Sequence, residues 1–336
     1  MNVAFIVDAS SKIGLGHWSR CINFSKILRK KNYFFSRYYP HEHKKLNNIN
    51  LIKIKKNKFN IKELKEKIKK YDIKILIIDN YYFNYKLQKQ IKKYVYKLIV
   101  IDDYYNKKHF CDILLNYSFL DKKEKLILKK NNPKAVLALG PKYLPLNLKF
   151  IELKKKVKLR KNVKKILVFF GGSDSLNMTE KLIVISKFFH NIKFSIILGS
   201  LNKKRMEISK KVKNYKNIKL FCSIKNEKMA NLISNSDLAI GAGGVNLFER
   251  IYLGLPSIVV DVNKNQHTNI KNSKKRELIR HLNYKSFTID KLKMLIQEFL
   301  ENEEKFYKIS KKCFYHLKYD QKKYLRGLVF LSNKYL

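Results

Sequence analysis

The chain has 336 residues, 45% of them hydrophobic, and a formal net charge of +48 at pH 7. This length and apolar content suffice for two domains of ordinary size, each with its own core. No segment approaches the roughly 18 apolar residues of a membrane-spanning helix, and the N-terminus lacks the basic and apolar stretches of a secretory signal. We therefore expect a cytoplasmic protein without stable membrane association.

The cysteines and histidines give no metal framework. The four cysteines form no CxxC pair: Cys21, Cys111, Cys222 and Cys313. This scatter is typical of reduced thiols and indicates neither disulfides nor a zinc site. The segment HEH at 41–43 has no cysteine or carboxylate cluster at matching spacing, so we expect no bound metal.

The large positive charge suggests nucleic acid at first sight. Only nine of the 74 basic residues are arginine, however, and the lysines are spread along the whole chain. Arginine is the better residue for bidentate phosphate and base contacts. The abundance of Lys, Asn, Ile, Tyr and Phe is typical of an AT-rich genome. We interpret the charge as lysines on solvated faces, with a mild attraction for anionic substrates, and expect no nucleic-acid partner.

The first half alternates short apolar runs with lysine-rich helical stretches. The runs predict strands at Val3–Val7, Phe34–Tyr38, Ile75–Ile78, Leu98–Ile101 and Ile113–Leu115. Helical spacing predicts helices at Cys21–Leu28, Ile61–Lys70 and Tyr85–Lys93. Such alternation indicates an α/β fold with a largely parallel sheet.

The second half repeats this alternation. Strands are predicted at Ile166–Phe170, Phe194–Leu198, Ile218–Phe221, Leu238–Ile240 and Ser257–Val260, and helical spacing runs from about Ile289 to the end. The two series are separated by a stretch that contains prolines and ends in a charged run, as interdomain links do. We expect an N-terminal domain over residues 1–148, a linker over 149–162 and a C-terminal domain with a helical tail over 163–336.

Three glycine turns follow predicted strands, and they read IGLGHWSRC, FGGSDSLN and GAGGVNLFER. They hold seven of the eleven glycines: Gly14, Gly16, Gly171, Gly172, Gly241, Gly243 and Gly244. Ligands of doubly wound sheets bind at the carboxyl ends of strands, so three such turns favour a ligand-binding cleft. Helix-start amides after the second turn, with Ser173 and Thr179 nearby, could bind a diphosphate. None of the turns fits the Rossmann dinucleotide or P-loop patterns.

These turns, with IIDNYY (77–82), IDDYYN (101–106), GLP (254–256) and NQ (265–266), occur in the order seen in one family. The chain resembles the UDP-2,4-diacetamido-2,4,6-trideoxy-β-L-altropyranose hydrolases of pseudaminic acid biosynthesis. That family is similar to the lipid II-forming N-acetylglucosaminyltransferase and shares its glycosyltransferase-B fold, with two Rossmann-like domains facing across a cleft. The resemblance covers residues 1 to about 270.

The resemblance implies hydrolysis of the anomeric C–O bond with inversion, on the N-terminal side of the cleft. His17, on a glycine loop, would take a proton from the attacking water. Gly14 and Gly16 would let this loop pass beside the sugar. Asp79, at the end of the third predicted strand, and Tyr81 would orient the water or the sugar, or tune the histidine.

The resemblance also implies that the C-terminal domain binds UDP. The remaining implied substrate-binding residues are Arg20, Gly171, Gly172, Ser173, Asn177, Ile224, Gly243, Gly244, Glu249 and Gln266. Glu249 would accept the ribose hydroxyls, Ile224 lies where backbone groups read uracil, and Gln266 would face the sugar. No metal or cofactor is implied, because helix-start and glycine-loop amides can neutralise the leaving UDP. We expect a monomer.

Several residues have a structural alternative. Arg20 could pair at the helix start, Trp18 could pack rather than stack on the sugar, and Asp102 and Asp103 could fix a turn.

The chain also departs from the family pattern at four places. Val245 replaces a small hydroxyl residue, Phe248 a tryptophan and Asn80 a histidine, and an arginine is missing near Asn147. These changes leave the exact sugar open. A glycosyltransferase of the same fold is the alternative enzyme, and a nucleic-acid-binding protein is the alternative of another class.

Overall fold

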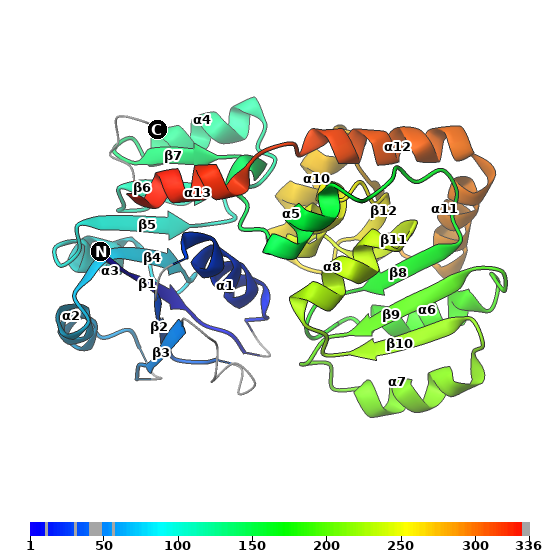
Figure 1. Ribbon diagram of the computed structural model, residues 1–336, viewed down its shortest axis with the longest axis horizontal. Coiled ribbons are helices and arrows are strands. Elements are labelled where there is room, and N and C mark those ends of the chain that lie inside the picture. The colour runs from blue at the N-terminus through cyan, green and yellow to red at the C-terminus, as the bar shows by residue number, and fades with distance from the viewer. Residues whose placement is uncertain (11–12, 30–31, 40–48, 56–57, 331–336) are drawn as a thin grey trace. The chain divides into compact units, whose positions relative to one another are not determined.

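The structure is a computed structural model that describes residues 1–10, 13–29, 32–39, 49–55 and 58–330 (Figure 1). The HEH segment lies outside the described residues. The chain divides into two compact units. The N-terminal unit comprises Met1–Leu146 together with the segment from Tyr319, and the C-terminal unit comprises Asn147–Lys318.

The N-terminal unit is built on a parallel seven-stranded sheet with the order β3-β2-β1-β4-β5-β6-β7. Its strands are β1 (Asn2–Val7), β2 (Asn32–Ser36), β3 (Ile49–Lys53), β4 (Ile73–Asp79), β5 (Lys97–Ile101), β6 (Ile113–Asn116) and β7 (Val136–Leu139). Its helices are α1 (Gly16–Leu28), α2 (Ile61–Lys70), α3 (Tyr85–Lys92), α4 (Lys122–Asn131), the 3-10 helix η2 (Pro141–Tyr143) and α13 (Gln321–Phe330). The parallel sheet confirms the α/β prediction for this unit.

Side-chain chemistry explains these elements. The residues of β1 from Val3 to Val7 are fully buried, as expected for a central strand covered on both faces. Helix α2 begins where the Asn60 side chain accepts hydrogen bonds from the amides of Lys62 and Glu63. Helix α4 begins with a reciprocal capping box between Asp121 and Glu124.

Two strands of this unit escaped prediction. Strand β3 lies at one edge of the sheet and β7 at the other, and most of their residues are only partly buried. Strand β3 (INLIK) mixes apolar and polar residues and gives a weak signal, whereas β7 (VLAL) is an apolar run that was overlooked. Asp79 therefore ends the fourth strand of the chain, not the third as predicted from the sequence.

The C-terminal unit is built on a parallel six-stranded sheet with the order β10-β9-β8-β11-β12-β13. Its strands are β8 (Lys165–Phe169), β9 (Lys193–Leu198), β10 (Ile218–Cys222), β11 (Leu238–Ala242), β12 (Ser257–Val260) and β13 (Arg280–Leu282). Its helices are α5 (Leu148–Lys154), α6 (Met178–Ser186), α7 (Arg205–Lys211), α8 (Asn226–Ser234), α9 (Val245–Tyr252), α10 (His267–Lys275), α11 (Ile289–Glu301) and α12 (Glu303–His316), with 3-10 helices η3 (Val212–Asn214), η4 (Lys264–Gln266) and η5 (Tyr284–Ser286). The edge strand β13 was not predicted.

The segment expected as a linker is part of the C-terminal unit. Helix α5 packs against α8 and α9. The Arg160 guanidinium is buried and donates to the backbone oxygens of Ser236 and Leu253. The expected boundary at 163 is therefore too late, because these backbone contacts hold the segment against the core.

The last helix belongs to the other unit. Helix α13 packs on α1 and η2, and Leu325, Leu328 and Val329 are buried there. Arg326 Nε donates to the backbone oxygen of Ile27 over 2.8 Å, and Lys97 Nζ donates to the Leu328 and Val329 oxygens at the end of α13. The tail from Tyr319 thus differs from the expected domain assignment.

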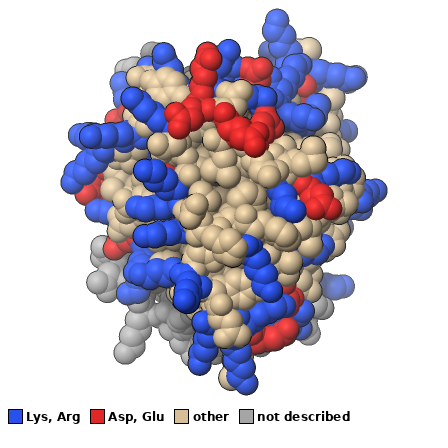
Figure 2. Space-filling model, turned by 90° about the vertical axis from the view of Figure 1, so that its right-hand side faces the viewer, with Lys and Arg blue, Asp and Glu red and all other residues tan. Residues whose placement is uncertain are grey.

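Charged side chains are dispersed on the face shown in Figure 2. There the Lys and Arg side chains lie around a central area with few charges, with carboxylates gathered mainly at the top of the view, and they form no continuous basic groove. This agrees with lysines on solvated faces, and the absence of a nucleic-acid partner stays a prediction. Within the part of the chain that the structure describes, no helix is long and apolar enough to cross a membrane.

Candidate functional site

Four elements of the N-terminal unit bring a polar network together. His17 and Arg20 are one turn apart near the start of α1, and Asp79 ends β4. Asp103 follows β5, and Tyr117 follows β6. Because these strands are parallel, their carboxyl ends share one edge of the sheet, and residues distant in sequence meet there.

His17 and Asp79 form a buried pair. The His17 ring nitrogen Nδ1 lies 2.6 Å from Asp79 Oδ1 and 2.8 Å from Arg20 Nη2. Because the ionised Asp79 carboxylate can only accept, we assign a hydrogen to Nδ1 that it donates to Asp79 Oδ1. Nε2 then carries a lone pair and makes no hydrogen bond to the described residues. His17 was expected on a loop, but it lies in the first turn of α1.

Arg20 holds the network together from inside. Its side chain is 1% exposed, and it donates to Asp79 through Nε and Nη2, to Asp103 Oδ1 over 2.7 Å, and to the Tyr117 hydroxyl. Because its donors are engaged in this way, Arg20 pairs with other residues of the protein. This is the structural alternative to substrate binding that the sequence left open. A direct substrate contact by Arg20 stays a prediction that this arrangement does not favour.

The charges of the network stabilise one another. Burial alone would raise the pKa of Asp79, but Arg20 and His17 outweigh it and hold that pKa well below its ordinary value. The pKa of Asp103 is likewise lowered, because Arg20 and His17 outweigh burial. Burial acts to lower the pKa of Arg20, and the two carboxylates raise it well above its usual value. Both carboxylates therefore stay ionised.

Tyr81 closes the network on one side. Its ring meets the His17 ring edge-on with centroids 4.6 Å apart, and its hydroxyl donates to Asp103 Oδ2 over 2.6 Å. Lys107 Nζ lies over the rings of Tyr81 and Tyr104. Tyr81 thus contacts the histidine ring directly, and its predicted roles toward water or sugar stay predictions.

Sequence reasoning missed Asp103 and Tyr117 as members of the network. The pair Asp102–Asp103 was taken to fix a turn, and only its first residue does so. Asp102 accepts from the Tyr104 amide over 3.0 Å and from His109 Nε2 over 2.9 Å. The position of Asp103 after β5 was the available signal, because it predicts a place at the same sheet edge.

A second buried ion pair lies at this edge. Asp8 Oδ2 accepts from Arg37 Nε and Nη2 over 2.8 and 2.7 Å, and from Asn80 Nδ2 over 2.7 Å. The Arg37 guanidinium stacks on Phe59. Asn80, which departs from the family pattern, therefore ties β4 to β1.

The first glycine turn is set by backbone conformation and packing. Gly14 has φ +85°, a conformation that L side chains rarely adopt, and nothing lies within 4 Å of the position a Cβ would take. Gly16 is exposed as the first residue of α1. Trp18 is 1% exposed and packs against Phe34, so it packs rather than offering a face to a sugar.

The turn after β8 differs from the expected phosphate cradle. The Asp174 carboxylate accepts from the amides of Met178 and Thr179 over 3.0 and 2.9 Å. These are helix-start amides of α6, so an internal carboxylate already occupies the place proposed for a diphosphate there. Gly171 and Asn177 both have positive φ, and Asn177 is exposed. The resemblance also implies that Gly171, Gly172 and Ser173 hold the diphosphate, and that role stays a prediction.

The turn after β11 leads into α9 without a side-chain cap. The Gly243 amide donates to Gln266 Oε1 over 2.9 Å, so Gln266 supports this turn. A Cβ on Gly243 would lie 2.4–2.6 Å from the Ile270 side chain, which is too close. Packing against Ile270 is therefore a sufficient reason for glycine at this position. Gly244 is the half-buried N-cap of α9 and, having no side chain, provides no cap to the amides of the first turn.

Glu249 lies on the second turn of α9 and is 8% exposed. Its carboxylate accepts from Asn246 Nδ2 over 2.7 Å. Burial raises the pKa of Glu249 to about 7, against smaller opposing effects of Asn246 and Arg250. Arg250 turns away and donates to the Ala242 oxygen. A buried carboxylate with one neutral donor is suited to accept hydroxyl hydrogens from a ligand.

The other predicted positions in this unit are also accounted for. Ile224 is half-buried in the loop after β10, at the carboxyl edge of the sheet. Asn147 caps α5 by accepting from the Lys149 amide over 2.9 Å. Phe248 is fully buried, and Val245 is the first residue of α9.

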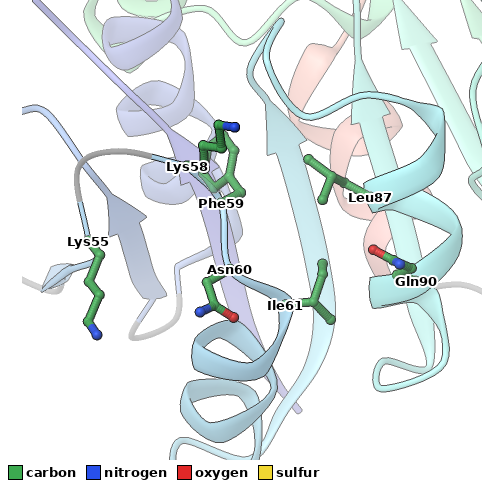
Figure 3. Close-up of a pocket in the computed structure, with 7 residues that line it drawn as sticks. All are labelled: Lys55, Lys58, Phe59, Asn60, Ile61, Leu87 and Gln90. Carbon is green, nitrogen blue, oxygen red and sulfur yellow. The ribbon is translucent and has the colours of Figure 1, made fainter.

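A hollow of about 640 Å³ lies elsewhere on the N-terminal unit, beside the starts of α2 and α3 (Figure 3). Its lining residues are Lys55, Lys58, Phe59, Asn60, Ile61, Leu87 and Gln90. The Asn60 oxygen is committed to the cap of α2, and no carboxylate or histidine lines the hollow. None of the predicted site residues lies there. Among the described residues, no group of three or more His, Cys, Asp or Glu side chains could hold a metal ion.

Comparison with known proteins finds one family model and two curated relatives that are similar to parts of this chain. Residues 166–325 match the model of the glycosyltransferase family 28 C-terminal domain. The uncharacterized protein MJ1062 of Methanocaldococcus jannaschii is 30% identical over 305 residues, which are 84% of this chain and 60% of that protein. The spore coat polysaccharide biosynthesis protein SpsG of Bacillus subtilis is 24% identical over 165 residues, 48% of this chain and 47% of that protein. The chain thus spans between about half and 60% of these curated relatives.

Solved structures agree on the fold. The MurG structure of Acinetobacter baumannii has a TM-score of 0.67 at 13% identity and covers 98% of this chain and 99% of that one. Medicago truncatula UGT71G1, complexed with UDP-glucose, has a TM-score of 0.67 at 11% identity, with 98% and 97% covered. The predicted fold class, two Rossmann-like halves of the glycosyltransferase-B type, is confirmed. The cleft between the halves stays a prediction.

Proposed function

We propose that the chain is a nucleotide-sugar hydrolase that releases UDP from UDP-2,4-diacetamido-2,4,6-trideoxy-β-L-altropyranose or a close diacetamido relative. The observation that carries the proposal is the buried His17–Asp79 pair, in which the Nε2 lone pair of His17 is left without a partner among the described residues. The match of residues 166–325 to a glycosyltransferase family 28 C-terminal domain supports a nucleotide-sugar substrate. The motif resemblance supports the choice of sugar.

In the proposed reaction the water oxygen attacks the anomeric carbon while His17 Nε2 takes one water proton. The bond between the anomeric carbon and the phosphate oxygen breaks, UDP leaves with that oxygen, and the configuration inverts. Asp79 accepts the hydrogen bond from Nδ1, fixes the tautomer and stabilises the imidazolium that forms. General-base catalysis of this kind contributes about 10²–10⁴-fold to the rate.

The C-terminal unit is assigned the nucleotide. Glu249 would accept the ribose hydroxyls, and the start of α9 at Gly244 would face the diphosphate, where helix-end amides favour negative charge. Asp174 blocks the corresponding amides of α6. We therefore assign the diphosphate to the turn after β11 rather than to the turn after β8.

A glycosyltransferase is the alternative, and the family 28 match favours it as a class. The two reactions differ in the acceptor. We would incubate the chain with a panel of UDP-diacetamido sugars and UDP-N-acetylglucosamine in ¹⁸O-water, without any acceptor, and analyse products by mass spectrometry. Hydrolysis yields unlabelled UDP and a free sugar labelled at its anomeric oxygen. Release that depends on a lipid or saccharide acceptor would instead establish the transferase.

The same preparation tests the nucleic-acid alternative. UDP should bind saturably at physiological salt. Binding of DNA driven by charge alone should weaken steeply as salt rises and show no sequence preference. Tight, salt-resistant and sequence-dependent DNA binding without UDP binding would overturn the enzyme proposal.

A further inference from the structure

The network around His17 contains more negative than positive charge. Two ionised carboxylates, Asp79 and Asp103, share the single guanidinium of Arg20. Both carboxylates are inside the protein, with side chains 0% and 12% exposed. With a neutral imidazole the group carries one unbalanced negative charge, and with an imidazolium it is neutral.

Among the described residues, no cation other than Arg20 and a protonated His17 is paired with these two carboxylates. The titratable groups that face His17 come from each element packed around it: Arg20 and Cys21 of α1, Asp79 of β4, Tyr81 after β4, Asp103 after β5 and Tyr117 after β6. Burial raises the pKa of the Cys21 thiol and of the Tyr117 hydroxyl, so both stay neutral. Lys107 lies behind Tyr81 and is 3.9 Å from Asp102, and Arg37 is paired with Asp8.

We propose that Asp103 is a positioning residue whose charge, delivered through Arg20, makes the network neutral when His17 holds a proton. Asp79 alone would be fully matched by Arg20, and protonating His17 would then leave one buried positive charge uncompensated. Asp103 shifts this balance by one charge. The imidazolium formed when His17 takes a proton from water is thereby stabilised by a buried network that has no net charge. The role of water as the proton source rests on the proposed function, whereas the charge balance does not.

The geometry also fixes the direction in which Asp103 acts. Its Oδ1 accepts from Arg20 Nη1, and its Oδ2 accepts from the Tyr81 hydroxyl. Both partners in turn contact His17, Arg20 through Nη2 and Tyr81 through its ring. Asp103 therefore acts on the histidine from two sides without a direct hydrogen bond to it.

The test follows His17 by NMR in the ligand-free protein. Histidines are labelled at the ring carbon Cε1, and His17→Phe identifies the His17 resonance. In Asp103→Asn we expect the pH midpoint of this resonance to fall by about one unit, the effect of removing one nearby opposite charge. Asp102→Asn is the matched control, because it removes a neighbouring carboxylate that faces His109. There the His17 midpoint should not move.

An unmoved midpoint in Asp103→Asn, or an equal shift in Asp102→Asn, would overturn the proposal. If Asp103→Asn does not fold, as judged by circular dichroism, Asp103→Ser removes the same charge with a smaller polar side chain, and the same fall is expected. A chain that hydrolyses no UDP-sugar would overturn the proposed function and leave the NMR result standing. If hydrolysis is found, the acidic limb of kcat should move to lower pH in Asp103→Asn by the same amount as the resonance.

Discussion

Nδ1 of His17 lies 2.6 Å from Oδ1 of Asp79, although 62 positions separate the two residues in the chain. The first turn of α1 and the end of β4 meet because β1 and β4 are neighbours in a parallel sheet. Their carboxyl ends then lie side by side, and the helix that follows β1 starts beside the end of β4. This pair determines the most direct test of the proposed reaction.

His17→Phe should lower kcat by about 10²–10⁴-fold, the usual contribution of a general base. UDP affinity should stay nearly unchanged, because the proposed uridine contacts belong to the C-terminal unit. The measurement is kcat together with UDP binding by calorimetry, and thermal melting controls for folding. A stable variant with the kcat of the wild type would remove His17 from the mechanism.

The stability of the N-terminal unit should fall in acid. The pKa values of Asp79 and Asp103 are lowered by Arg20 and His17 against the effect of burial. An aspartate whose pKa is lower in the folded state contributes stability that is complete above its unfolded value, about 3.9, and is lost as the pH falls below it. The free energy of unfolding, measured in urea from about pH 6 down to about pH 2, should show this loss. A profile that is flat there would contradict the assigned charges.

Glu249 should give the opposite dependence. Its pKa is raised to about 7 by burial, so the ionised form is disfavoured in the ligand-free fold. Its contribution to stability is present below the unfolded value of about 4.3 and is lost as the pH rises to about 7. Hydroxyl donors from a ribose would favour the ionised form, so UDP binding should release a proton and tighten as the pH rises toward 7.

Calorimetry in buffers of different ionisation enthalpy measures this proton release. Glu249→Gln should abolish it and weaken UDP binding by about 1–3 kcal/mol, the cost of losing hydrogen bonds to a charged group. Glu180→Gln is the control, because Glu180 of α6 is already paired with Lys204. There the UDP affinity should not change. Unchanged UDP affinity in a folded Glu249→Gln protein would reject the ribose assignment.

The last helix should be required by the N-terminal unit. Deleting residues 319–336 exposes the surface that Leu325 and Leu328 cover, so we expect a lower melting temperature and loss of cooperative unfolding of that unit. Arg326→Ala removes one hydrogen bond to the end of α1 and should cost about 1 kcal/mol. Lys323→Ala changes an exposed residue of the same helix and should cost nothing measurable. A deletion variant as stable as the full chain would show that α13 is dispensable.

Chelation tests the expectation that hydrolysis needs no metal. After treatment with EDTA, we expect UDP release at an undiminished rate, because backbone amides at the start of α9 are proposed to neutralise the leaving diphosphate. The measurement compares initial rates with and without the chelator, and again after adding Mg²⁺. Complete loss of activity that Mg²⁺ restores would contradict this expectation.

Much of the fold could be predicted from local sequence pattern. The helix predicted over Ile61–Lys70 begins and ends at those residues, and the central strands lie where apolar runs placed them. The edge strands β3, β7 and β13 were missed: β3 and β13 lack a continuous apolar run, whereas β7 has the run VLAL and was overlooked. The glycine turns lie at strand ends as predicted, because strand, turn and helix follow one another locally, whereas His17 lies in the first turn of α1 rather than on the loop.

Only the tertiary structure decided which partners those residues have. Asp103 and Tyr117 join His17 because parallel strands align their carboxyl ends, a relationship between distant segments that no local pattern contains. Asp174 turned out to occupy the amides expected for a diphosphate, because the turn brings its side chain back onto α6. Helix α13 packs on α1 because burying Leu325 and Leu328 there removes apolar surface from water. It does so although the C-terminal unit directly precedes it in the chain.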